Sequence, residues 1–79
     1  MKAYGYTNEG KFIELNEVSL ECNLDELTKI ADFVNHAKEL HSSDDCRDKY
    51  CHSHYRDWNK DFDKGSSDLI IITNIDKCK

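Results

Sequence analysis

The chain has 79 residues, of which 38% are hydrophobic and 34% are charged, and its net charge is −5. A chain of this length supports one small core and leaves no room for a second domain, so residues 1–79 are expected to form a single globular domain with a strongly solvated surface. The acidic balance argues against nucleic acid as a partner, because binding phosphates requires clustered Lys and Arg. A basic protein is a better-matched partner.

No stretch of the sequence approaches the roughly 20 apolar residues that a membrane span needs, and the N-terminus lacks the apolar region of a secretory signal. We therefore expect a cytoplasmic protein without membrane contact. The four cysteines, Cys22, Cys46, Cys51 and Cys78, are then expected to be reduced and free. The tail 76–79 is expected to fray.

The first elements are predicted to be two strands. A β-prone run at 2–7 and an apolar run at 12–22 are separated by a turn that contains glycine, which is typical of a hairpin. Within the second run the apolar alternation changes face between Leu15 and Val18. This change predicts a bulge at Asn16–Glu17 that would keep one face buried.

A helix is predicted from about Leu24 to Leu40. Asn23 is a good N-cap, and Glu26 stands three residues later. The apolar residues at helical spacing, expected to form the packed face, are Leu24, Leu27, Ile30, Ala31, Val34 and Ala37. His36 and His41 are expected to be surface or capping residues.

Two more strands are predicted at 49–56 and 69–73, and the second of these, rich in β-branched residues, is expected to be the central strand. The predicted order is β-β-α-β-β. We therefore expect an α+β fold, in which a small antiparallel sheet of about four strands packs the long helix on one face and leaves the other face uncovered.

The segment from Cys46 to Trp58 concentrates the residues with chemical potential. If it is extended, His52 and His54 point to the same side. Together with Asp57 and Cys51 they would supply nitrogen, carboxylate and sulfur ligands to Zn²⁺, or would support a metal-dependent hydrolase. The paired Cys or His knuckles of structural zinc sites are missing, however, so a partner-binding strand without a cofactor is the favoured interpretation.

The favoured partner-binding residues are Tyr50, His52, His54, Asp57 and Trp58. They would lie along or beside the uncovered face of the sheet. Two alternatives remain for the aromatic residues. Trp58 would be a buried anchor in so small a core, or Tyr50, Tyr55 and Trp58 would pack two open sheet faces together in a homodimer.

Three segments of the sequence resemble the immunity protein 32 family of bacterial polymorphic-toxin systems: AYGYTNEGKFIELNEVSLECNLDELTKIADFV, CHSHYRDW and SDLIIITN. By position, the resemblance marks His52, His54, Asp57, Trp58 and Asp68 as the distinctive residues, whereas Cys46 and Cys51 match nothing in it. It implies a cytosolic antidote that binds and blocks a toxin domain, and not an enzyme. The acidic charge of the chain suits a basic toxin domain. We expect the protein itself to be a monomer or a weak homodimer.

Overall fold

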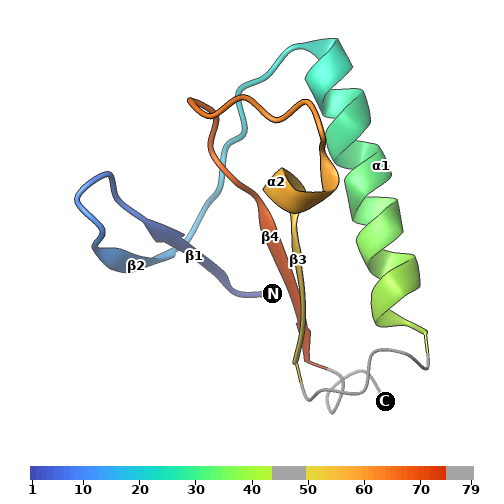
Figure 1. Ribbon diagram of the computed structural model, residues 1–79. Helices are drawn as coiled ribbons and strands as arrows, with labels where there is room; N and C mark the ends of the chain where they lie inside the picture. The colour runs from blue at the N-terminus through green and yellow to red at the C-terminus, as the bar shows by residue number, and fades with distance from the viewer. Residues whose placement is uncertain (44–49, 75–79) are drawn as a thin grey trace.

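The computed structural model describes residues 1–43 and 50–74, which form a small α+β fold (Figure 1). In chain order the elements are β1 (Ala3–Tyr6), β2 (Phe12–Leu15), α1 (Leu24–His41), β3 (Tyr50–His54), α2 (Tyr55–Trp58) and β4 (Ile70–Asn74). Within the described residues the strands form two separate antiparallel pairs, β1–β2 and β3–β4. The α+β class is confirmed, but the predicted single sheet of four strands is not formed.

The β1–β2 hairpin confirms the predicted turn, and its Gly10 adopts φ +84°, a left-handed conformation that favours glycine. Its register runs from Ala3 opposite Leu15 to Tyr6 opposite Phe12. Beyond Leu15 the chain pairs with no described strand before α1 begins. The predicted bulge at Asn16–Glu17 is therefore wrong, because the apolar residues after it have no strand partner.

Helix α1 has nearly the predicted limits. The side-chain oxygen of Asn23 accepts a hydrogen bond from the Glu26 amide at 2.8 Å, which confirms the cap. The side chain of Glu26 does not complete a reciprocal capping box. Its carboxylate accepts a hydrogen bond from the Tyr55 hydroxyl at 2.5 Å and so ties the first turn of the helix to α2.

The packed face of α1 differs from the predicted one. Its buried residues are Phe33, Ala37 and His41. Of the predicted packed residues, Leu24 is 79% exposed, Leu27 50% and Val34 44%. Helical spacing identified a broad apolar sector, and the rest of the chain covers only one side of it.

The second pair of strands also departs from the prediction in part. Strand β3 ends at His54, and the next four residues turn as the short helix α2, whose end is held by a hydrogen bond from the Asn59 amide to the Tyr55 carbonyl at 2.8 Å. The predicted strand over 49–56 is thus too long. Strand β4 pairs only with β3 among the described residues, so it is not the central strand.

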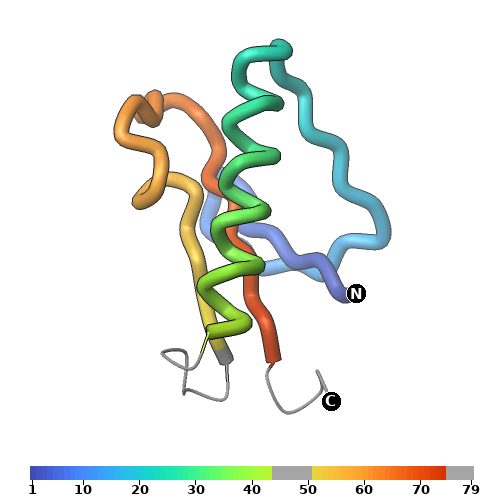
Figure 2. The backbone as a smooth tube through the Cα atoms, turned by 90° about the vertical axis from the view of Figure 1, so that its right-hand side faces the viewer, coloured from blue at the N-terminus to red at the C-terminus, as the bar shows by residue number. Residues whose placement is uncertain are grey.

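Helix α1 covers one side of the β3–β4 sheet, and the β1–β2 hairpin stands on the other side (Figures 1 and 2). The buried hydrophobic residues, Phe33, Ala37, Cys51 and Tyr55, lie where α1 meets β3 and α2. No helix within 1–43 and 50–74 is long and apolar enough to cross a membrane. The predicted frayed tail at 76–79 lies outside the described residues.

Candidate functional site

The β3–β4 sheet has one covered and one open face. Cross-strand partners share a face, and the register pairs His52 with Ile72 and His54 with Ile70. On this side Ile70 is 45% exposed and Ile72 54% exposed. His52 is exposed as well, while His54 is half-buried. We call the side formed by His52, His54, Ile70 and Ile72 the open face.

The predicted partner-binding residues do not all lie on the open face of the sheet. His52 and His54 lie on the open face, as alternation predicted. Tyr50 is opposite Asn74 in the same register, but its side chain lies outside what the structure describes. Asp57 is exposed on α2. Trp58 packs toward α1, so it does not form one continuous surface with the histidines.

Trp58 belongs to the rim of an aromatic core. Its ring centroid lies 5.7 Å from that of Phe33 and 6.1 Å from those of His36 and Tyr55, and Trp58 is half-buried. This geometry corresponds to the alternative in which the tryptophan anchors the core. An aromatic ring with a half-exposed edge still offers contact area, but on the helix side of the molecule.

Tyr55 is the centre of that core and is only 2% exposed. Besides its bond to Glu26, its hydroxyl accepts a hydrogen bond from the Asn59 side chain at 3.0 Å. Burial, and then the hydrogen bond and the charge of Glu26, raise the pKa of Tyr55 to about 12. Tyr55 is therefore an interior residue, and the idea that it packs in a homodimer interface is wrong.

The covered face of the sheet is joined to α1 by His41. Its Nδ1 lies 2.7 Å from the Thr73 hydroxyl oxygen, and its Nε2 lies 2.8 Å from that of Ser53. Both hydroxyls can donate or accept, so either neutral tautomer is satisfied. The expectation that His41 is a surface or capping residue is wrong, because its hydrogen-bond partners come from strands far along the chain.

The His41 imidazole is held neutral. Burial, and then the charges of His52 and His36, lower its pKa. A serine hydroxyl bound to a neutral imidazole has the form of a nucleophile and base, but Ser53 is only 8% exposed beneath the helix. The other hydrogen-bond partner of His41 is the Thr73 hydroxyl, whereas a catalytic triad has at that position a carboxylate that stabilises the imidazolium. The cluster therefore holds the helix to the sheet.

Asp68 connects the open face to α2. One carboxylate oxygen accepts hydrogen bonds from the Arg56 amide at 2.8 Å and the Leu69 amide at 2.9 Å, and the other lies 3.1 Å from His54 Nδ1. Burial of the carboxyl works to raise its pKa, but the hydrogen bonds outweigh it and the net pKa of Asp68 is lowered. The carboxylate thus fixes the orientation of the His54 ring.

The alternative zinc ligands are not brought together. Cys51 is disulfide-bonded and lies on the covered face, opposite to His52 and His54. Within 1–43 and 50–74 no three His, Cys, Asp or Glu side chains are placed to hold a metal ion. The expectation that Cys51 is a free thiol is also wrong. Cys22 is free and exposed, and the expectations for Cys46 and Cys78 fall outside the described residues.

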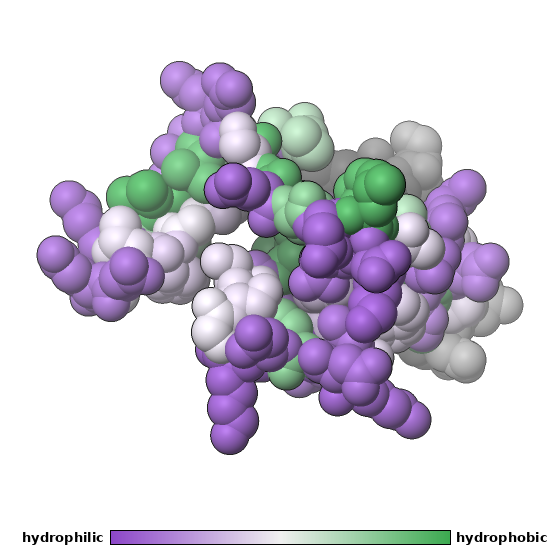
Figure 3. Space-filling model, turned by 90° about the horizontal axis from the view of Figure 1, so that it is seen from above, coloured by the Kyte–Doolittle hydropathy of each residue, from purple (hydrophilic) through white to green (hydrophobic). Residues whose placement is uncertain are grey.

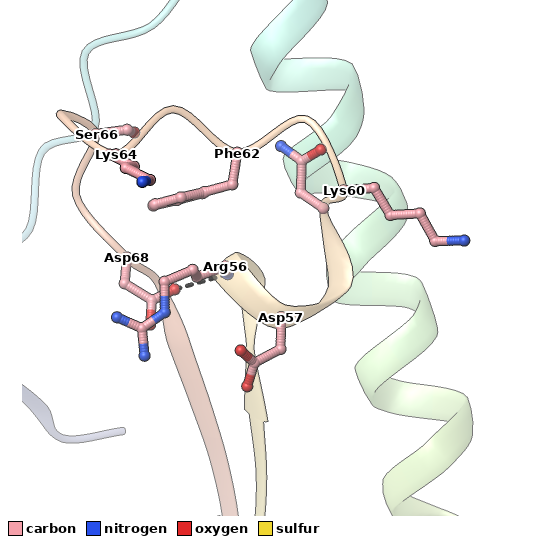
Figure 4. A pocket seen from close by; sticks show the side chains of 8 residues that line it. Arg56, Asp57, Lys60, Phe62, Lys64, Ser66 and Asp68 are labelled. Carbon is pink, nitrogen blue, oxygen red and sulfur yellow. Dashed lines mark hydrogen bonds between the residues drawn. The ribbon is translucent and has the colours of Figure 1, made fainter.

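The sequence did not predict a pocket, but the loop between α2 and β4 encloses an open cavity of about 530 Å³ (Figure 4). It is lined by Arg56, Asp57, Asn59, Lys60, Phe62, Lys64, Ser66 and Asp68. Arg56 lies beside Asp68, while Lys60 points away from the space. With cations and carboxylates both in its lining, the cavity has no single charge that would select a ligand.

Sequence reasoning also missed an aromatic patch on the β1–β2 hairpin. The ring of Phe12 stacks on that of Tyr4 at 5.2 Å and contacts that of Tyr6 at 5.1 Å between centroids. All three are exposed, Tyr6 at 73%. The signal was present in the sequence, because residues 4 and 6 share one face of a strand and the turn places Phe12 opposite Tyr6.

Comparison with protein-family models, with curated proteins and with solved structures finds no match for this chain.

Proposed function

We propose that this chain is a protein-binding module of the immunity type, which docks its open face onto a basic toxin domain and blocks it. The observation that carries the proposal is the pair of exposed isoleucines on β4, Ile72 opposite His52 and Ile70 opposite His54. Full burial of an isoleucine contributes about 1.5–3 kcal/mol, and since about half of each is still exposed, a partner would gain about 1 kcal/mol from each.

The polar groups beside the isoleucines suit a binding surface better than a catalytic one. The ring of His54 is oriented by Asp68, and the exposed His52 ring offers a hydrogen-bond donor or acceptor at the margin of the apolar pair. A rim of polar groups around an apolar centre is the usual anatomy of an interface. The net charge of −5 would accelerate encounter with a basic domain.

Binding of the full chain to basic toxin domains of polymorphic-toxin systems tests this proposal, and isothermal titration calorimetry is a suitable assay. We expect Ile72→Asp to weaken binding roughly ten-fold or more, because it replaces one of the two apolar side chains of the open face by a charged one. Val18→Asp is the matched control, since Val18 is 50% exposed but lies in the linker before α1. Unchanged affinity of the Ile72 variant would contradict the proposal.

A second candidate, a homodimer through the same open face, rests on the same two isoleucines. Sedimentation separates the two functions. Self-association that Ile72→Asp abolishes would favour the homodimer, whereas a chain that binds the toxin domain through this face and does not self-associate through it would favour the antidote.

The proposal places the protein in the cytosol, where an antidote meets a toxin that acts inside the cell. The disulfide at Cys51 is unusual for that compartment, because cytosolic thiols are kept reduced. Trapping the thiols of intact cells with an alkylating reagent, followed by mass spectrometry, tests the location. Protection of Cys51 in those cells would point to an oxidising compartment instead.

A further inference from the structure

Strand β4 has one edge paired with β3 and a second edge with which no described strand pairs. The view from above shows apolar side chains at the surface in separate patches among hydrophilic ones (Figure 3). The extent of apolar surface on that side therefore does not specify a partner. The main chain at the unpaired edge of β4 is more specific, because it carries amide donors and carbonyl acceptors at a fixed spacing.

One hydrogen bond fixes which main-chain groups point to the unpaired edge. The Tyr55 amide donates to the Leu69 carbonyl at 2.8 Å, one step beyond the last paired residues of β3 and β4. Hydrogen-bonded and non-hydrogen-bonded pairs alternate along an antiparallel ladder. The next pair, which contains Ile70, is therefore non-hydrogen-bonded, and so is the pair that contains Ile72. The amides and carbonyls of these two isoleucines point away from β3.

These outward groups have no main-chain partner in the described part of the chain. Outside the ladder, the backbone hydrogen bonds of residues 1–43 and 50–74 involve neither Ile70 nor Ile72. The linker 16–23 before α1 is exposed throughout and pairs with no described strand. Both isoleucines are about half exposed, Ile70 at 45% and Ile72 at 54%. Another extended main chain presents donors and acceptors at the spacing that these groups require.

Strand β4 also lacks the features by which proteins protect an edge strand. Such protection usually comes from a charged side chain, a proline or a bulge. Residues 70–74 carry no charge, the chain has no proline, and the register with β3 is regular along the whole strand. The outer edge of β3 differs, because the same alternation assigns it to His52 and His54. The edge of β4 is therefore the one suited to pairing with another strand.

We propose that β4 pairs in antiparallel fashion with β4 of a second copy of this chain, with the two-fold axis at Ile71. Ile70 of each copy then lies opposite Ile72 of the other, and each such pair exchanges both of its N–H···O bonds. All outward amides and carbonyls of Ile70 and Ile72, in both copies, are then used. We call this arrangement the edge dimer.

The side chains match in the same register. Ile70 and Ile72 of both copies form one apolar cluster on the open face, and cross-strand pairs of β-branched residues stabilise a sheet. Ile71, which is half-buried, lies opposite its own copy on the covered face. At each end of the pairing the register brings Asp68 opposite Asn74, so no two like charges meet. Strand β4 is thus complementary to itself, which favours a second copy as the occupant.

The edge dimer differs from a homodimer that packs two open faces together. In the edge dimer the open faces lie side by side in one continuous sheet and stay exposed, whereas face-to-face packing would bury them. The edge dimer does not depend on the proposed antidote function. It would present two adjacent pairs of isoleucines to any partner of the open face.

Sedimentation equilibrium of the full chain, over a roughly hundred-fold range of concentration, tests the edge dimer. Ile72→Pro removes an outward amide that the ladder with β3 does not use, and proline is tolerated on an edge strand, so the monomer should keep its circular dichroism spectrum. We expect this variant to raise the dimer dissociation constant roughly ten-fold or more. Ile72→Thr is the matched control. It keeps the amide and the β-branched shape, so the constant should change by less than about three-fold.

Amide hydrogen exchange, followed by NMR at a low and a high concentration, tests the same edge in the wild-type chain. The amides of Ile71 and Thr73 point to β3 and should be protected at both concentrations. The amides of Ile70 and Ile72 should exchange fast at the low concentration and become protected at the high one.

Three results would overturn the inference. The first is a wild-type monomer at the highest concentration. The second is a dimer that Ile72→Pro leaves intact, or in which the amides of Ile70 and Ile72 stay unprotected. The third is equal weakening by Ile72→Thr and Ile72→Pro, because it would indicate that isoleucine side chains packed face to face hold the dimer together.

Discussion

Replacement of His41 by alanine should be among the most destabilising changes in this chain. The imidazole makes hydrogen bonds of 2.7 and 2.8 Å to the hydroxyls of Thr73 and Ser53. Each bond contributes about 1 kcal/mol, and the buried Ser53 hydroxyl left without a partner costs a further 1–3 kcal/mol or so. We expect a loss of about 3 kcal/mol, out of a total stability of about 4–12 kcal/mol for 79 residues.

Urea denaturation, followed by far-ultraviolet circular dichroism and by the fluorescence of Trp58, measures this loss. His52→Ala is the control, because His52 is exposed on the same sheet and should change the free energy of unfolding by less than about 0.5 kcal/mol. If the free energy of unfolding of His41→Ala lies within about 0.5 kcal/mol of the wild-type value, the His41 cluster does not hold the helix to the sheet.

The same cluster predicts a dependence on pH. The pKa of His41 is lowered in the fold from its ordinary value of 6.5, so the unfolded chain binds the proton more readily. Stability from this residue is fully present above pH 6.5 and is lost as the pH falls below it. In a His41→Leu variant the part of the slope due to this residue should disappear. An unchanged slope would show that other groups cause it.

The remaining predictions concern the Asp68 carboxylate, the buried Tyr55 and the disulfide at Cys51. Asp68→Asn should lower the free energy of unfolding by about 1–2 kcal/mol in urea denaturation, while exposed Asp57→Asn should have little effect. In a spectrophotometric titration one of the four tyrosines should ionise near pH 12, and Tyr55→Phe should remove that phase. Alkylation of the purified, unreduced protein should modify Cys22 and leave Cys51 unmodified, as peptide mass spectrometry would show.

Local signals predicted the first hairpin and the long helix. The turn at Gly10 depends only on residues next to it in the sequence. The cap of α1 likewise involves two residues three positions apart, Asn23 and Glu26. Strand β3 was predicted too long because β propensity continues through Tyr55. Its backbone turns into α2 instead, with Asp68, twelve residues beyond Arg56, accepting the Arg56 amide. No local pattern contains that contact.

The site was predicted only in part, again because local patterns do not contain contacts between distant residues. Alternation placed His52 and His54 on one side of a strand, and that side is open. It did not predict that the face of Cys51 is the one that α1 covers, or that Trp58 turns toward Phe33. Both depend on which face the helix covers, which is a property of the packed chain.

The α+β class, the limits of α1 within a residue or so and the alternation of faces along β3 could all be predicted from the sequence, because they follow from backbone geometry and near neighbours. Two features could not be predicted in this way: which part of the apolar sector of α1 is buried, and the role of His41 in joining the helix to the sheet. Burial is set by competition among distant segments for the same surface, and partners 12 and 32 residues away cannot be read from local spacing.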